Sequence, residues 1–323
     1  MDTDQIDMAA VLGLGIMGHG IAQTFATAGL TVRCFDVAEQ PRSSLHDRVR
    51  ANLRRFEQAG LIDADAIEPV LGRLAVYDDE RDAVSGAQYV VEAVREDFET
   101  KQQLFARIEP WVSQDCVLAS NTSTFPMTEI AAGLRYPQRA INTHWFNPPH
   151  ICPLVEVVPG EKTSAETVET TIALHKRIGK MPIRINQELP GFLVNRIQMA
   201  LMREVLDLLE RGVASAEDID RAVRGSMGMR LAAVGPLAVW DFGGLDTAAR
   251  VYDYLVRDIR SDRELPKVVE KLMADGRFGL KTGKGFFQYS PTNSAEIIAR
   301  RDGNYIAFLK LFLRESDDLR DGS

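Results

Sequence analysis

The chain has 323 residues, of which 45% are hydrophobic and 26% charged; this composition is typical of a globular protein and excludes a largely disordered one. The formal charge of -8 argues against a nucleic-acid partner, because binding to phosphates needs clustered lysine and arginine. The acidic start and the lack of a long apolar run predict no membrane partner and a cytoplasmic location. At this length we expect two domains.

The first part of the chain, from Met8 to about Ile185, alternates short apolar runs with helical patterns. This alternation predicts a parallel sheet with helices on both faces. The expected strands are AAVLGLG at 9–15, TVRCFD at 31–36, YVVEAV at 89–94 and CVLAS at 116–120, and the runs at 132–146 and 152–160 continue the pattern.

A charged stretch between Ala38 and Asp79 has its apolar positions at helical spacing, which predicts an inserted pair of helices with a turn at Gly60. After Pro190 and Gly191 the strand pattern stops and a mostly helical remainder begins. We therefore place the domain boundary near 186–190, with a sheet domain at 1–188 and a helical domain at 189–323.

A glycine-rich turn follows the first expected strand and opens a helix, and an aspartate ends the next strand. This arrangement is the fingerprint of a Rossmann-type, doubly wound α/β fold: the glycines allow a tight turn and close approach of a pyrophosphate, and the carboxylate binds the ribose. The alternatives are an ordinary strand-to-helix turn and an aspartate that merely ends a strand. The fingerprint predicts NAD as cofactor, bound by Gly13, Gly15, Ile16, Met17, Gly18 and Asp36.

Oxidation of an alcohol by hydride transfer needs a group that accepts the hydroxyl proton, and histidine is the usual one near neutral pH. The chain has five histidines. His19 lies in the glycine turn, and we expect His46 and His175, on charged helices, to face solvent. His144 and His150 remain, late in the sheet domain, where strand ends face the cofactor crevice.

Glu156 lies among apolar residues in the run PLVEVV, where a carboxylate is costly to bury without a cationic or hydrogen-bonding partner. A histidine such as His144 is a natural partner. The alternative is a Glu156 exposed at a strand edge and a histidine packed in the core, and the residues alone leave both open.

Several segments, taken together and in this order, resemble the L-3-hydroxyacyl-CoA dehydrogenase family. They are GLGIMG at 13–18 with Asp36, SNTS at 120–123, HWFNP at 144–148, LVE at 154–156, PGFLVNR at 190–196 and KTGKGFF at 281–287. The resemblance extends from about Met8 to Tyr289 and implies an NAD-dependent dehydrogenase.

By this resemblance His144 is the catalytic base, and Glu156 orients it and balances its charge. Ser123 and Asn195 correspond to polar residues around the substrate oxygen and the nicotinamide. Without the family, Ser123 would be interpreted as a helix cap and Asn195 as a polar position on an apolar helix. The resemblance adds three cofactor-binding residues: Glu96, Lys101 and Asn147.

One segment departs from the family pattern. Members specific for acyl-CoA carry a segment of the type HPMGPL, whereas this chain has GMRLAAVGPL at 228–237. Its Arg230 is more similar to relatives that oxidise free hydroxy acids, among them gulonate, carnitine and pyridine-carboxylate dehydrogenases. A guanidinium suits bidentate recognition of a carboxylate, so Arg230 is a candidate substrate-binding residue.

The expected function is therefore the NAD-dependent oxidation of a 3-hydroxy acid or a 3-hydroxyacyl-type secondary alcohol. The alternatives are an L-3-hydroxyacyl-CoA dehydrogenase proper, acting on 3-hydroxybutyryl-CoA, and a crystallin-like structural protein. A dehydrogenase of the hydroxyisobutyrate type also begins with GLGxMG, but the SNTS and HWFNP segments argue against it.

Three cysteines, Cys34, Cys116 and Cys152, lack metal-ligand spacing and predict neither a disulfide framework nor a metal site. Cys152 lies eight positions after His144, which leaves a nucleophilic thiol as an alternative. The apolar tail at 305–313 and the family resemblance predict a homodimer assembled through the helical domain.

Overall fold

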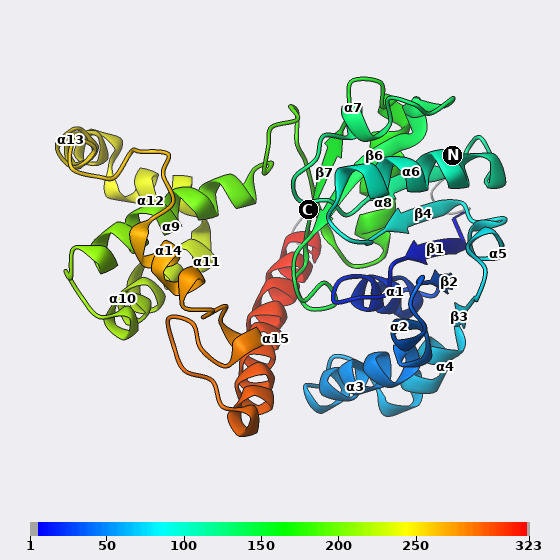
Figure 1. Ribbon diagram of the computed structural model, residues 1–323, viewed down its shortest axis with the longest axis horizontal. Helices are drawn as coiled ribbons and strands as arrows, with labels where there is room; N and C mark the ends of the chain where they lie inside the picture. Colours follow the sequence, from blue (N-terminus) through cyan, green and yellow to red (C-terminus); the bar gives the residue numbers. More distant parts are fainter. Residues whose placement is uncertain (1–5, 322–323) are drawn as a thin grey trace. The chain divides into compact units, whose positions relative to one another are not determined.

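The computed structural model describes residues 6–321, without the side chains of 291–293 and 314–321. The chain forms two compact units (Figure 1). The first contains the residues through Asn195 and those from Arg300 onward, and the second contains Arg196–Ala299.

The first unit is built on an eight-stranded sheet with the order β3-β2-β1-β4-β5-β6-β7-β8. Neighbouring strands are parallel except for β6 and β7, which are antiparallel. The strands are β1 Met8–Leu12, β2 Thr31–Phe35, β3 Leu74–Val76, β4 Tyr89–Glu92, β5 Val117–Ser120, β6 Ala140–Trp145, β7 Leu154–Pro159 and β8 Met181–Arg184.

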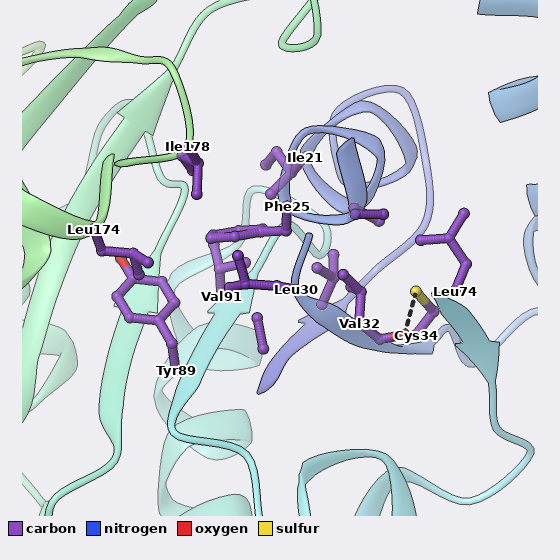
Figure 2. Packing of buried hydrophobic residues seen from close by; sticks show 14 of the residues in the cluster. Ile21, Phe25, Leu30, Val32, Cys34, Leu74, Tyr89, Val91, Leu174 and Ile178 are labelled. Atoms are coloured by element: carbon purple, nitrogen blue, oxygen red, sulfur yellow. Dashed lines mark hydrogen bonds between the residues drawn. The ribbon is translucent and has the colours of Figure 1, made fainter. Parts of the chain in front are cut away.

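Helices cover both faces of this sheet, which is why every residue of the central strands β4, β5 and β6 is buried. On one face, Ile21 and Phe25 of a helix contact Val32 and Val91 of the sheet in a single buried cluster (Figure 2). A second cluster on the other face includes Leu104. The expected doubly wound α/β fold is confirmed. The helices of this unit before residue 196 are α1 Gly18–Thr27, α2 Glu39–Ser43, α3 Leu45–Gln58, α4 Ile67–Gly72, α5 Glu80–Val84, α6 Phe98–Ile108, α7 Met127–Ile130 and α8 Ala165–Arg177.

The stretch 38–79 is helical only in part. It forms α2, α3 and α4, and α3 ends before a turn at Gly60, whose φ is +67°. The prediction of helices alone is wrong at Leu74–Val76, which forms the edge strand β3. Its backbone pairs with β2, and three residues are too few to show a strand period in the sequence.

The second unit is helical, and within the described residues its only extended pairings are isolated bridges that involve Gly279, Lys284 and Gln288. No helix in the described part of the chain is both long and apolar enough to cross a bilayer. The helices from residue 194 on are α9 Val194–Glu210, α10 Ala216–Ala222, the π-helix Val223–Gly228, α11 Met229–Val234, α12 Pro236–Gly243, α13 Leu245–Leu255, α14 Lys267–Ala274 and α15 Pro291–Asp321.

The far part of α15 returns to the first unit. Ile306 is buried in a small cluster with Phe56 and Ile151. Nearby, Arg55 of α3 forms an ion pair of 3.1 Å with Asp302. The apolar tail expected at 305–313 is therefore covered at Ile306, whereas Phe308 remains half exposed.

Candidate active site

The glycine turn lies at the switch point of the sheet, between β1 and β4. The helix after β1 covers one face and the helix after β4 covers the other, and doubly wound folds bind their ligands at such a switch point. Gly13 has a φ of +87°, and a Cβ there would lie 2.7 Å from the carbonyl carbon of Ala93. At Gly18 a Cβ would lie 1.7 Å from the Gly13 oxygen. Both positions therefore need glycine for the turn itself.

Gly15 differs from these two glycines. A Cβ there would meet no atom of the described chain within 4 Å, so the open space is available to a cofactor. Ile16 is exposed, Met17 is half buried and α1 begins at Gly18. A backbone that approaches open space at a helix N-terminus fits a pyrophosphate, and these residues therefore fit NAD.

Asp36 lies directly after β2 and is fixed across the same turn. Its Oδ2 accepts a hydrogen bond of 2.7 Å from Leu14 N, and its Oδ1 accepts one of 2.8 Å from Ala38 N. Arg33 points elsewhere and donates to the carbonyl groups of Asp82 and Ser85. The site thus presents the Asp36 carboxylate for ribose hydroxyls. The Arg33 guanidinium donates to backbone carbonyl groups of the protein and is not directed at this position.

His144 and Glu156 form a buried pair at the carboxyl end of β6. The antiparallel register of β6 and β7 places the two residues directly opposite each other, and His144 Nδ1 lies 2.7 Å from Glu156 Oε2. His144 is 6% exposed and Glu156 is 0% exposed. Because an ionised carboxylate only accepts, Nδ1 is the nitrogen that donates and Nε2 is the one that can take a proton.

The second oxygen of Glu156 binds the start of α9. Glu156 Oε1 accepts hydrogen bonds of 3.1 Å from Leu193 N and 2.8 Å from Val194 N. Asn195 is the next residue in the chain after Val194. The structure thereby brings together two of the residues expected to be catalytic, His144 and Glu156, and Asn195 lies one residue beyond the amides that bind Glu156.

Ser123, the fourth, follows β5, the neighbour of β6 in the sheet. Its backbone N–H donates to Glu96 Oε1 over 3.1 Å, and Thr122 Oγ1 donates to the same oxygen over 2.6 Å. Burial alone would raise the pKa of Glu96, but the Thr122 hydroxyl and the charge of Lys101 outweigh it and hold the pKa below its usual value. Glu96 is thus an ionised anchor for the Ser123 loop.

Lys101 lies beneath this loop and is 1% exposed. Its Nζ lies 2.9 Å from Glu92 Oε1 and 3.2 Å from Glu96 Oε2. Ser120 also donates to Glu92, which ends β4 and is fully buried. Lys101 therefore holds two carboxylates together.

The buried Lys180 binds the loop that follows His144. Lys180 Nζ donates to the carbonyl oxygens of Pro149 and Cys152, the latter over 2.9 Å, and lies 5.1 Å from the ring centre of Trp145. Burial lowers the pKa of Lys180 to about 7. Asn147 is exposed on this loop, as a cofactor-binding side chain would need to be.

The prediction that His175 faces solvent is wrong. His175 is fully buried, its Nδ1 lies 2.7 Å from Thr171 O, and its ring lies 5.3 Å from that of Trp145. The charged residues of α8 suggested an exposed helix, but its other face packs on the sheet. His46 is half buried, with Nε2 3.2 Å from Leu74 O.

His19 and His150 pack on each other beside the glycine turn, with ring centres 6.1 Å apart. Burial lowers the pKa of His150 to about 3, and the pKa of His19 is also below its usual value because of burial. His150 is therefore held neutral, and its ring is near Phe56.

The cysteines give no sign of a nucleophile. Cys34 and Cys116 are buried, and Cys152 is partly buried. Burial raises the pKa of the Cys152 thiol, which disfavours the reactive thiolate.

Arg230 lies on α11 in the second unit and is exposed. Its NH2 group is 3.4 Å from Ser226 Oγ, a long contact that leaves the guanidinium open to a ligand. Arg230 belongs to the second unit, whereas His144 and Glu156 belong to the first.

Two kinds of site residue escaped the sequence analysis. Glu92 could have been found by the reasoning applied to Glu156, because it too is a carboxylate at the end of an apolar strand. Phe146 and Phe192 contact His144 with ring centres 4.4 Å and 5.7 Å away. Aromatic residues in apolar motifs give no such signal.

Two family models match the chain. Residues 8–188 match the family "3-hydroxyacyl-CoA dehydrogenase, NAD binding domain", and residues 191–289 match "3-hydroxyacyl-CoA dehydrogenase, C-terminal domain". The chain belongs to the 3-hydroxyacyl-CoA dehydrogenase family and is an NAD-dependent oxidoreductase. The resemblance noted in the sequence is confirmed, as is the cofactor.

The relatives include both CoA and free-acid enzymes. A 5-formyl-3-hydroxy-2-methylpyridine 4-carboxylate 5-dehydrogenase of Mesorhizobium japonicum is 39% identical, over 94% of this chain and 97% of the relative. A probable 3-hydroxybutyryl-CoA dehydrogenase of Bacillus subtilis is 34% identical, over 90% of this chain and 100% of the relative. A lambda-crystallin homolog of Homo sapiens is 35% identical, over 70% of this chain and 72% of the relative.

The fold also matches solved structures. The crystal structure of a 5-formyl-3-hydroxy-2-methylpyridine 4-carboxylic acid 5-dehydrogenase, described as an NAD+-dependent dismutase, has a TM-score of 0.89 and 36% identity, and the match covers 95% of this chain and 98% of that one.

Proposed function

We propose that this dehydrogenase oxidises the hydroxyl group of a small 3-hydroxy acid that carries a free carboxylate, with His144 as the proton acceptor. The observation that supports the mechanism most is the buried His144–Glu156 pair, with 2.7 Å between Nδ1 and Oε2. This geometry leaves His144 Nε2 as the acceptor for the substrate proton.

The same pair supplies what the reaction needs next. As the hydroxyl proton moves to Nε2, the positive charge that forms on the imidazole lies next to Glu156, which stabilises it in a water-poor site. NAD, when bound, accepts the hydride. Ser123 and Asn195 supply polar groups for the substrate oxygen and the nicotinamide, and Glu96, Lys101 and Asn147 shape the cofactor side.

Two features support a free acid over a CoA thioester. The 39% identical relative, which matches nearly the whole chain, is named for a pyridine carboxylate, and the exposed Arg230 offers a guanidinium for a carboxylate. The 3-hydroxybutyryl-CoA dehydrogenase relative keeps the thioester as the second candidate function.

A substrate panel tests this choice. NADH formation should be measured with 3-hydroxybutyrate, gulonate, carnitine and 3-hydroxybutyryl-CoA. We expect turnover of at least one free acid, and Arg230→Met should raise the KM of that acid by about tenfold or more while the KM of NAD stays unchanged. Efficient oxidation of the CoA thioester with no turnover of any free acid would overturn the proposal, and no turnover at all would favour a structural, crystallin-like role.

We further propose that residues 1–188 bind NAD, that 189–323 form the substrate and dimerisation domain, and that the dimer works in the cytoplasm. The apolar surface of the second unit supports the dimer. Its buried apolar side chains within the described residues are Leu206, Ile219 and Pro266, whereas Leu237 is 81% exposed and Phe242 is 79% exposed. Apolar surface of this extent is typical of an interface.

A further inference from the structure

The turn before α9 contains an unusual backbone conformation. Phe192 has a φ of +49°, and among the described residues it is the only non-glycine residue with a positive φ. Gly191, just before it, has a φ of +76°. A side chain in the left-handed region costs conformational energy, and glycine would adopt this φ at less cost.

The contacts of the Phe192 side chain offset the conformational energy of its backbone. Phe192 is 3% exposed, and its ring centre lies 5.7 Å from that of His144. Phe146 contacts the imidazole as well, with ring centres 4.4 Å apart. His144 is therefore held by two aromatic rings in addition to its hydrogen bond to Glu156.

The backbone of Phe192 acts on the same pair. Its left-handed turn, closed by a hydrogen bond of 2.8 Å from Phe192 N to Leu189 O, is followed by the two N–H groups that donate to Glu156, those of Leu193 and Val194. These amides complete the hydrogen bonding of a carboxylate that is fully buried. One residue thus contacts the base and aims the donors that hold the partner of the base.

We propose that Phe192 is a positioning residue for the reaction: its ring keeps the His144 imidazole in line, and its left-handed turn presents the start of α9 to Glu156. The inference rests on the proposed role of His144 and adds a residue that acts through it. Strained backbone at an active site is a recognised way to hold reacting groups in place, and a misplacement of about 1 Å can cost up to about 100-fold in rate.

Matched leucine variants test the ring. Phe192→Leu keeps an apolar side chain but loses the aromatic face. Phe56→Leu is the control, because Phe56 is 9% exposed and packs on His150 with ring centres 5.9 Å apart. We expect kcat of Phe192→Leu to fall by about tenfold with the KM of NAD within about twofold, and kcat of Phe56→Leu to stay at the wild-type value.

A second pair tests the turn. Phe192→Gly and Phe192→Ala both lack the ring, but only glycine adopts the positive φ without cost. We expect Phe192→Ala to lose more turnover than Phe192→Gly. Nitrogen-15 spectra of the imidazoles, with the His144 signals assigned from His144→Gln, should show proton exchange between Nδ1 and Nε2 in the Phe192 variants and a single form, protonated at Nδ1, in the neutral wild type.

The outcomes separate this inference from the proposed function. If folded, NAD-binding Phe192→Leu and Phe192→Gly keep the wild-type kcat and the wild-type imidazole spectrum while His144→Gln is inactive, Phe192 is only a core residue and the inference is wrong. If His144→Gln is fully active, the proposed base is wrong and the inference is overturned with it.

Discussion

Glu156 accepts three hydrogen bonds with one carboxylate: from the imidazole of His144 and from two backbone amides. A buried carboxylate with fewer partners would destabilise the fold. Because each oxygen has a different task, one can orient the base while the other holds the start of α9. Removal of the charge should therefore affect both the chemistry and the local structure.

The residues alone left two possibilities for Glu156, a pair with a histidine such as His144 or an exposed position at a strand edge, and the family resemblance favoured the pair. The ion pair of Lys101 with Glu92 could not be predicted from the sequence, because the two residues become neighbours only when β4 and α6 pack together. The prediction that His175 faces solvent was wrong because the charged residues of α8 indicate one exposed face but do not show which residues lie on the opposite, buried face.

His175 should make the stability of the protein depend on pH. Burial lowers its pKa to about 4 in the folded protein, whereas an unfolded histidine titrates near 6.5. Between about pH 6.5 and 4 the unfolded chain binds a proton that the native state refuses, so this group lowers the free energy of unfolding as the pH falls, by up to about 3 kcal/mol. Above about pH 6.5 it has no such effect.

Urea unfolding of wild type and His175→Met at pH 7 and pH 5 measures this contribution. The neighbours of His175 are Tyr89, Trp145, Phe25 and, through its charge, Lys180, and none of these residues is substituted in the variant. The wild type should lose about 2 kcal/mol more than the variant between the two pH values. An equal loss in both proteins would show that His175 does not titrate in this way.

At the scale of elements, apolar runs bounded by turns predicted the central strands, because strands covered by helices on both faces consist mainly of apolar residues. The pattern failed at β3, where three residues at the sheet edge follow a helix directly. It also could not predict that β7 runs antiparallel to β6, although this pairing is what sets His144 opposite Glu156. Strand direction depends on the connecting loop rather than on strand composition.

The glycine turn allows a matched test of cofactor binding. At Gly15 an added methyl group meets open space, whereas at Gly18 it lies 1.7 Å from the Gly13 oxygen. We expect Gly15→Ala to keep the wild-type Tm but to weaken NAD binding by about tenfold or more, because the methyl group enters the space of the pyrophosphate. Gly18→Ala should lower the Tm as well, since backbone must move.

Calorimetry of NAD binding together with thermal unfolding checks both variants. Wild-type affinity for NAD in Gly15→Ala would show that the open space at Gly15 is not the pyrophosphate site.

At the scale of the whole molecule, the second unit has many apolar side chains that the chain leaves exposed. We expect light scattering at micromolar concentration to give the mass of a dimer, because burial of such surface drives association. Replacement of exposed Leu237 and Phe242 by aspartate should weaken the dimer, whereas aspartate at Met181, which is 47% exposed in the first unit, is the control. A monomeric wild-type mass would contradict the dimer.

The most direct test of the account is the rate of hydride transfer in a single turnover of His144→Gln, with substrate and NAD preloaded and NADH fluorescence as the signal. Loss of a general base typically costs about 100-fold to 10,000-fold, so we expect a fall of this size with NAD affinity and thermal stability near the wild-type values. Glu156→Gln should also slow the step, because the imidazolium loses its charged partner. A folded, NAD-binding His144→Gln variant with near-normal hydride transfer would show that His144 is not the base.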